Sequence, residues 1–160
     1  MPIIFFWKPH EIHGFLSNWY YSDIIINDQK FNCVEQYFMW RKLKLFEPSN
    51  RNLELQLLDT KNPAEMKRIG GHVKNYNEII WNNERYDIMK EGLYAKFIQN
   101  DILKRKLLDT NDFILVEASP YDSIWGIGMT SAVASKVSQN QWKGKNLLGI
   151  ALMEVRANLS

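Results

Sequence analysis

The spacing of hydrophobic residues changes along the chain, and each spacing predicts a kind of element. Short apolar runs at residues 3–7 and 113–118 predict two buried strands. Two short extended pieces are expected on either side of the turn NDQK at residues 27–30. Residues 33–46 are apolar on nearly every helical face, which predicts a central, buried helix. Glu35 and Lys42 are polar residues of that helix, so their burial needs a structural or functional explanation.

Polar and turn residues mark the boundaries of further helices. One helix is expected near residues 50–58. A second begins at Pro63, which suits the first helical position after the N-cap Asn62, and it ends at Gly70. The longest helix is expected at about residues 82–99.

The last part of the chain adds two helices. One is predicted near residues 101–108, and the final one begins at the N-cap Asn146 and has i, i+3, i+4, i+7 apolar spacing. Gly92 inside the long helix costs about 1 kcal/mol relative to alanine, which indicates close approach of another backbone or a ligand. The pattern predicts an α+β, mostly α fold with a few short strands, forming a single compact domain over residues 1–160.

Composition narrows the functional classes. Hydrophobic residues make up 46% and charged residues 24% of the chain, the balance of a soluble globular protein. The net charge of +2 is too small to indicate nucleic-acid binding by itself. Cys33 is the single cysteine, which excludes an internal disulfide and a cysteine-only zinc site, so a small buried residue is expected. With no signal peptide and no membrane-length apolar run, a cytoplasmic protein without a membrane partner is expected.

Three carboxylates are candidates for chemistry. Glu35 lies on the buried helix, Glu117 ends the second strand, and Asp122 follows in the stretch LVEASPYDSIWGIG. Burial raises the pKa of a carboxyl group unless a cation or hydrogen-bond donor stabilises its charged form. Such groups are candidates for acid–base or charge-stabilising roles. For Glu117 the alternative is a helix cap or a pairing with Arg85 or Arg156.

Aromatic and basic side chains complete the candidate set. Trp125 is expected in a loop before Gly126 and Gly128, where an indole can stack on a planar ring. Core packing is the alternative for each tryptophan. Four cations on predicted helices could bind a phosphate if they are not simply solvated: Lys42, Lys67, Arg85 and Lys96.

The inventory suits a reaction in which the substrate itself becomes cationic. The three histidines have no metal-ligand spacing, and no nucleophile elbow or glycine-rich phosphate loop is present. Cleavage of an N-glycosidic bond passes through an oxocarbenium-like transition state that a carboxylate stabilises. In that reaction an aromatic ring would hold the base, and basic side chains would hold the phosphate.

Several stretches occur in the order typical of one family: GFLSNWY, VEQYFM, AEMKRIG, GLYAKFIQN, LVEASPYDSIWGIG and WKGKNLLGIALMEVR. They resemble the NADAR (NAD and ADP-ribose) superfamily, and especially the YbiA-like N-glycosidases of riboflavin-biosynthesis intermediates. The resemblance covers about residues 5–156. It implies an N-glycosidase of metabolite damage control that uses no metal or other cofactor. The implied reaction releases ribose 5-phosphate from phosphoribosylated aminopyrimidines.

The resemblance also implies site residues. It assigns catalytic acids to Glu35, Glu117 and Asp122. It assigns substrate contacts to Ser17, Asn18, Trp19, Trp81 and Trp125. Two departures from the family pattern, Gln36 and the segment 22–25, are expected to touch the base pocket.

Two other functions remain open. Some members of the superfamily remove ADP-ribose from guanine in DNA or RNA, so ADP-ribosylated nucleic acid is an alternative partner. The weak net charge argues mildly against binding of extended duplex, although a flipped base or a single strand needs little charge. The third alternative is a non-catalytic module that binds ADP-ribose or a related nucleotide. The presence of all three acids argues against it.

Overall fold

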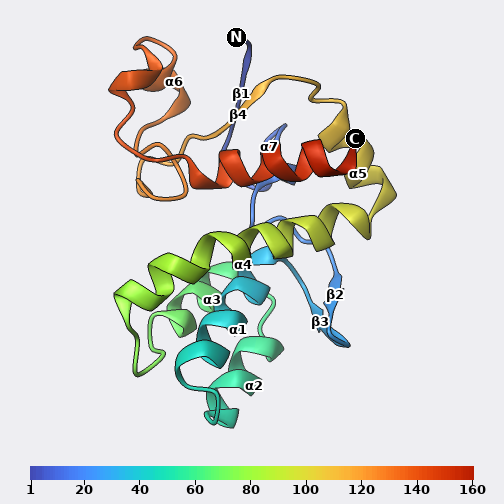
Figure 1. Ribbon diagram of the computed structural model, residues 1–160, viewed down its shortest axis with the longest axis vertical. Coiled ribbons are helices and arrows are strands. Elements are labelled where there is room, and N and C mark those ends of the chain that lie inside the picture. Colours follow the sequence, from blue (N-terminus) through green and yellow to red (C-terminus); the bar gives the residue numbers. More distant parts are fainter. The chain divides into compact units, whose positions relative to one another are not determined.

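The computed structural model describes residues 1–160 and confirms an α+β, mostly α fold (Figure 1). Seven α-helices accompany four short strands. The chain forms two compact units. Unit 1 consists of Met1–Tyr20 and Asn100–Ser160, and unit 2 consists of Tyr21–Gln99. The single domain over residues 1–160 stays a prediction.

Unit 1 is built around a parallel strand pair. The strand β1 (Ile3–Phe6) pairs with β4 (Ile114–Glu117), so that Ile3 lies opposite Ile114 and Phe6 opposite Glu117. Both strands were predicted, each within a residue or two of its observed ends. The other elements of this unit are η1 (Gly14–Leu16), α5 (Asp101–Leu108), α6 (Ser131–Ala134), η2 (Gln139–Gln141) and α7 (Leu147–Leu159). The short elements η1, α6 and η2 had no periodic signal in the sequence.

The helix α7 packs against β4 in unit 1. The side chains at the predicted apolar spacing are fully buried: Leu148, Ala151, Leu152 and Val155. A second cluster of buried residues surrounds Val116 and Ile127, and Phe5 and Trp142 pack against it. The end of β4 is therefore held by packed side chains.

Asn146 stands at the N-cap position of α7, as predicted, but its side chain does not cap the helix. Its backbone is left-handed, with φ of 53°. The carboxamide oxygen instead accepts the Glu117 N–H at 3.0 Å, and the carboxamide nitrogen donates to the Leu115 carbonyl at 2.9 Å. The expectation of a side-chain cap was wrong because the strand edge takes both polar atoms.

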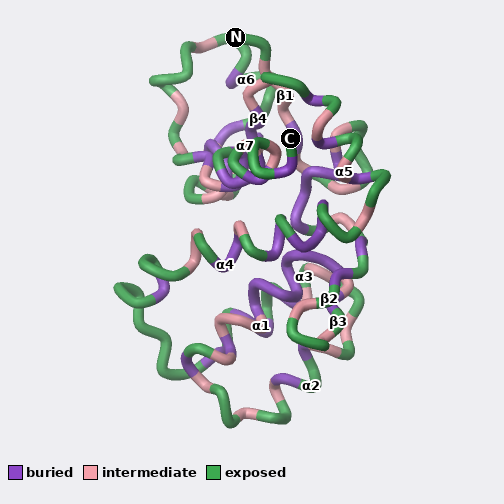
Figure 2. Tube along the Cα trace, turned by 45° about the vertical axis from the view of Figure 1, so that its right-hand side comes forward, coloured by how far each residue is buried: buried purple, intermediate pink, exposed green.

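Unit 2 places a helical cluster beside a hairpin. The strands β2 (Ile24–Ile26) and β3 (Gln29–Phe31) are antiparallel, and Asn27 and Asp28 join them with positive φ, as a tight hairpin turn requires. The helices are α1 (Val34–Phe46), α2 (Arg51–Asp59), α3 (Pro63–Gly70) and α4 (Glu78–Ile98). Helix α1 contacts the other three helices of the unit and is largely buried, as predicted (Figure 2).

The capping signals located the ends of α3 correctly. Asn62 caps α3 by accepting the Ala64 N–H at 3.0 Å, and Pro63 is its first residue. Helix α4 begins at Glu78, four residues before the predicted start, and Asn77 caps it. Gly92 does lie at a close approach, to side chains of α1 and not to another backbone. A Cβ there would lie 2.9 Å from Tyr37 Cδ2.

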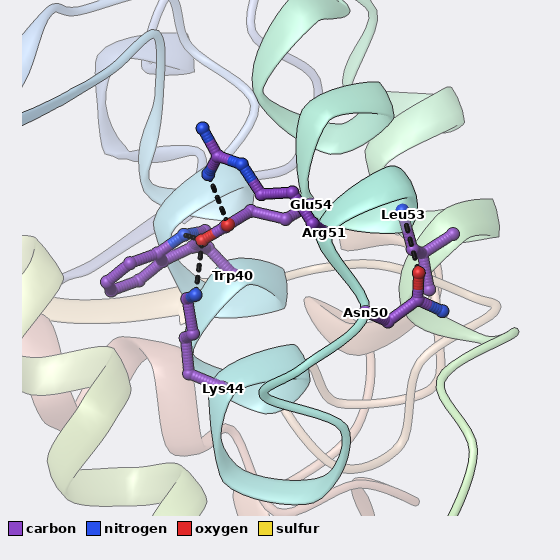
Figure 3. Close-up of polar contacts among 6 residues, drawn as sticks. All are labelled: Trp40, Lys44, Asn50, Arg51, Leu53 and Glu54. Atoms are coloured by element: carbon purple, nitrogen blue, oxygen red, sulfur yellow. Dashed lines mark hydrogen bonds and ion pairs between the residues drawn. The ribbon is translucent and has the colours of Figure 1, made fainter.

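A buried ion cluster joins α2 to α1 (Figure 3). Glu54 is 5% exposed and accepts from Lys44 Nζ at 2.5 Å, Arg51 Nη1 at 2.5 Å and Trp40 Nε1 at 2.9 Å. Burial alone would raise the pKa of Glu54, but these hydrogen bonds lower it below its ordinary value. The carboxylate is saturated by its partners, which is typical of a structural role. No helix of the protein combines the length and the apolar character needed to cross a membrane.

Candidate active site

Glu35 lies in the first turn of α1 and is only 7% exposed. The burial expected from the sequence is confirmed. The positive end of the helix dipole favours a carboxylate at this position. Lys42 follows seven residues later on the same helix, so both side chains lie on one face. Burial lowers the pKa of Lys42 below its ordinary value, against a smaller opposing effect of the Glu35 charge.

Lys42 lies among aromatic rings. Its Nζ is 4.8 Å from the ring centroid of Tyr76 and 5.9 Å from that of Trp81. These separations are suitable for cation–π attraction. Trp81 is itself buried and packs on Phe38 at a centroid distance of 5.0 Å, so it is a core residue as well as a wall of this cluster.

Lys96 is the most buried charged residue of unit 2, with 1% of its surface exposed. Burial lowers its pKa to about 7, against a smaller opposing effect of Cys33. The Cys33 thiol is also buried, as expected, and contacts Met66 Sδ at 3.5 Å. Burial raises the pKa of Cys33 to about 11, and the charge of Glu35 adds to the increase. Cys33 therefore lies within electrostatic range of both Glu35 and Lys96.

The two remaining candidate cations have more open surroundings. Arg85 is half-buried on α4, and Lys67 is exposed on α3. Neither side chain forms an ion pair or a hydrogen bond, so both can accept an anionic ligand without breaking an existing contact.

In unit 1, Glu117 ends β4 and is half-buried. Its carbonyl oxygen accepts the Ile127 N–H at 2.9 Å, which folds the following loop back onto the strand. A Cβ at Gly126 would lie 2.9 Å from that carbonyl oxygen and 3.2 Å from Glu117 Oε2. Gly126 therefore leaves room for Glu117.

Asp122 shapes the turn that presents Trp125. Its Oδ1 accepts the N–H groups of Ile124 at 2.9 Å and Trp125 at 2.8 Å. Its carbonyl oxygen accepts the N–H of Gly128, whose φ of 70° suits glycine. Trp125 is half-buried at the end of this turn. One oxygen of the Asp122 carboxylate is thus committed to the backbone.

The SNW stretch follows η1 in unit 1. Ser17 is buried, and its hydroxyl accepts the Trp19 N–H at 3.2 Å. Asn18 is 8% exposed, and its buried Oδ1 has no hydrogen-bond partner. A buried acceptor of this kind is available to a ligand donor. Trp19 is 37% exposed.

The structure groups the predicted site residues within each unit. Unit 2 brings Glu35, Lys42 and Trp81 together and connects Lys96 to them through Cys33. Unit 1 brings together the acids and the aromatic ring of the loop after β4: Glu117, Asp122, Trp125 and Gly126. Sequence reasoning missed Tyr76 because it lies in an irregular segment before α4, where no periodicity indicates its neighbours.

Gln36 and Arg156, two neighbours considered in the sequence analysis, have structural partners. Gln36 does not line an open pocket, because its side chain accepts the Asn32 N–H and donates to the carbonyls of Leu57 and Thr60. Arg156 does not pair with Glu117, since it donates to Thr110 Oγ1 at 2.8 Å and to a backbone carbonyl. No cluster of three or more histidine, cysteine or acidic side chains is arranged to hold a metal ion.

Sequence and fold comparisons agree on the class of protein to which this chain belongs. The NADAR domain model matches residues 5–160, so the chain belongs to the NADAR domain family. It is 35% identical over 150 residues to N-glycosidase R617 of Acanthamoeba polyphaga mimivirus. The matched region covers 94% of this chain and 83% of that protein. It is 30% identical to a riboflavin biosynthesis protein of Vibrio vulnificus over 98% of this chain but only 38% of that protein.

A solved structure has the same fold. The NMR structure of the E. coli protein YbiA matches with a TM-score of 0.79 at 28% identity, covering 99% of this chain and 84% of that one. The resemblance found in the sequence motifs is therefore confirmed.

Proposed function

We propose that this protein hydrolyses the N-glycosidic bond of phosphoribosylated aminopyrimidine intermediates of riboflavin biosynthesis and releases ribose 5-phosphate. The protein is a hydrolase of N-glycosyl bonds, in keeping with the N-glycosidase names of its relatives. The riboflavin intermediate is the finer part of the proposal. It is supported by the family resemblance and by the name of the Vibrio vulnificus relative.

The observation that carries the proposal is the placement of the buried Glu35 and of Lys42, which interacts with it electrostatically, on one helix face beside aromatic rings. Glu35 is buried in the first turn of α1, where the positive end of the helix dipole favours its charged form. Lys42 lies on the same helix face against Tyr76 and Trp81. A carboxylate stabilises a ribosyl cation, and a nearby ammonium binds a phosphate. One helix face thus offers groups for both ends of a ribose phosphate.

The reaction is a hydrolysis in which water replaces the base. The bond between C1′ of the ribose and the base nitrogen breaks, and its electron pair goes to that nitrogen. The water oxygen bonds to C1′, and one water proton ends on the departing base. In this scheme Glu35 stabilises the positive charge on the sugar or takes the water proton. From the family motifs alone we also propose that Glu117 and Asp122 of unit 1 orient the ribose hydroxyls or the water, and that Trp125 stacks on the base.

A product assay with two substrate classes tests the proposal. Purified protein is incubated with the phosphoribosylated aminopyrimidines and, separately, with ADP-ribosylated guanine in single-stranded DNA. Release of ribose 5-phosphate from the first, at a higher kcat/KM than loss of ADP-ribose from the second, is expected. The reverse preference would move the substrate to nucleic acid, and binding without turnover of either would indicate a non-catalytic module.

A further inference from the structure

The edge of β4 that faces away from β1 has no strand partner. In a strand, alternate residues direct their backbone N–H and C=O groups to opposite edges. Ala118 donates its N–H to Phe6 on the β1 side, at 2.8 Å. The N–H of Glu117 and the C=O of Leu115 face the other edge, where the Asn146 carboxamide binds both. One side chain thus replaces a neighbouring strand at the point where Glu117 is placed.

The backbone of Asn146 also binds the loop that carries Trp125. Its N–H donates to the Gly126 carbonyl at 3.1 Å, and its own carbonyl accepts the Ile150 N–H at 3.1 Å. Asn146 is 7% exposed, so these bonds are shielded from water. The left-handed backbone at this position is one that asparagine and glycine adopt more readily than other residues.

Gly149 makes space for the carboxamide. A Cβ at Gly149 would lie 2.4 Å from Asn146 Nδ2 and 2.0 Å from the Leu115 carbonyl oxygen. Real Cβ atoms do not approach that closely, so the first turn of α7 can lie against β4 only because residue 149 has no side chain. Asn146 and Gly149 together therefore allow the first turn of α7 to pack closely against the end of β4.

We propose that Asn146 is the positioning residue for Glu117: its carboxamide fixes the backbone of Glu117 and thereby the direction of the carboxylate. This inference rests on the proposed role of Glu117 in the N-glycosidase reaction. Asn146 does not itself act on the substrate. Its contribution is to hold the acid within the narrow range of geometry that the reaction needs.

The first test is Asn146→Gly, which permits the left-handed backbone and removes the side chain with its carboxamide. We expect kcat to fall by about tenfold to a hundredfold at a temperature where circular dichroism shows both proteins folded. Asn111→Gly is the matched control, because Asn111 is also a left-handed asparagine of unit 1, with φ of 50°, but lies on the surface. The control should keep the wild-type kcat. Wild-type kcat in Asn146→Gly would overturn the inference.

The second test is Asn146→Asp, which replaces the carboxamide by a titratable carboxyl group of nearly the same shape. A protonated aspartic acid can accept from Glu117 and donate to Leu115, whereas an ionised one faces the Leu115 carbonyl with a negative oxygen. The pKa of the new carboxyl should therefore be raised in the folded protein. The kcat of this variant relative to wild type should be higher at pH 5 than at pH 8. A ratio that does not change with pH would contradict the inference.

Amide hydrogen exchange separates this inference from the proposed function. The Glu117 N–H is protected through Asn146, so it should exchange faster in Asn146→Gly while the Ala118 N–H, held by β1, stays protected. If wild-type protein hydrolyses no N-glycoside, the proposed function fails, and this exchange pattern still decides whether Asn146 holds Glu117. Unchanged protection of the Glu117 amide would reject the positioning role even in an active enzyme.

Discussion

Two glutamates are buried in unit 2, and their surroundings differ. Glu54 accepts from Lys44, Arg51 and Trp40, which leaves its carboxylate no capacity for a substrate. Glu35 is similarly buried on the neighbouring helix, and Lys42, which interacts with it electrostatically, lies against aromatic rings. Burial alone therefore does not separate a structural acid from a reactive one. The partners of the carboxylate do.

Replacing Glu35 by glutamine should remove turnover and keep the fold. The change deletes the negative charge at nearly constant volume, and a single carboxylate in such a role contributes roughly 10²–10⁴-fold to the rate. The measurement is kcat with the preferred substrate, alongside a thermal melt. Glu54→Gln is the control: it should lower stability by about 1–3 kcal/mol while the folded fraction keeps its activity. Near-normal turnover by Glu35→Gln would remove Glu35 from the catalytic set.

Lys96 makes a pH-dependent contribution that opposes folding. Its folded pKa of about 7 lies below the ordinary value of 10.5, so between these two pH values the unfolded chain binds more protons than the folded one. Stability attributable to Lys96 should rise as pH increases from 7 to about 10. Lys96→Met should accordingly raise Tm at pH 7, by an amount that shrinks toward pH 10.

The same variant tests whether Lys96 has a function. A buried cation that lowers stability is retained when activity depends on it. Lys96→Met should therefore lose catalytic efficiency although it melts at a higher temperature. A variant that is both more stable and fully active would show that Lys96 has no role at the site.

At the scale of elements, the loop after β4 combines a turn and a ligand surface. The Asp122 carboxylate binds two backbone N–H groups through Oδ1. Asp122→Ala should cost about 1–3 kcal/mol by leaving them without an acceptor. Asp122→Asn retains that oxygen, so its Tm should match wild type while its kcat/KM falls because the charge is lost. Wild-type kcat/KM in the asparagine variant would confine Asp122 to the turn.

Trp125 is presented at the end of this turn. Stacking on a base contributes roughly 1–3 kcal/mol, so Trp125→Ala should lose about one to two decades of kcat/KM. Trp125→Phe should recover part of the loss, since a smaller ring still stacks. Thermal stability should change little in either variant. If the alanine variant unfolds at room temperature and a rescued form turns over normally, the indole is a core residue.

The sequence predicted elements better than contacts. Asn62–Pro63 located the start of α3 because a capping side chain and a fixed φ act locally. The start of α4 was placed too late, since the exposed Ile79 and Ile80 follow the cap without an apolar period. Asn146 was assigned the local role of a cap, whereas its partners lie about thirty residues away on β4. A sequence pattern carries local preferences and does not show which distant strand edge needs a donor.

The candidate site shows the same limit. The family motifs identified Glu35, Trp81 and Glu117 as candidate site residues. The burial of Glu35 was predicted from the helix pattern. The near-complete burial of Lys96 was not, because a lysine on a helix face is usually solvated. The rings around Lys42 have no sequence signal, since their grouping depends on tertiary packing. The double hydrogen bond of Asp122 is instead a local turn contact, to the N–H groups two and three residues on.

At the scale of the whole molecule, the two units differ in how their contacts are spread along the chain. Unit 2 is one continuous segment, whereas unit 1 joins the first twenty residues to the last third of the chain. The pairing of Ile3 with Ile114 closes a loop that contains all of unit 2. Closing so long a loop costs more entropy than forming the neighbouring helices of unit 2.

Pulse-labelled hydrogen exchange during refolding should show this difference. The amides of α1 and α4 are expected to gain protection before those of β4 that donate to β1. The Ala118 N–H, which binds the Phe6 carbonyl, is a convenient reporter for the strand pair. Earlier protection of Ala118 than of α1 would mean that the long-range pair forms first.

During synthesis on the ribosome, β1 is translated well before β4 and therefore remains unpaired for some time. The apolar segment Ile3–Phe6 leaves the exit tunnel long before its partner strand has been translated. Throughout that interval it is a bare strand with two open edges, the kind of segment that chaperones bind and that aggregates form around. Pro2 precedes it, and Lys8 and Pro9 follow shortly after it, and such residues beside an apolar strand oppose aggregation. The flanks of β1 thus protect the nascent chain until β4 has been translated.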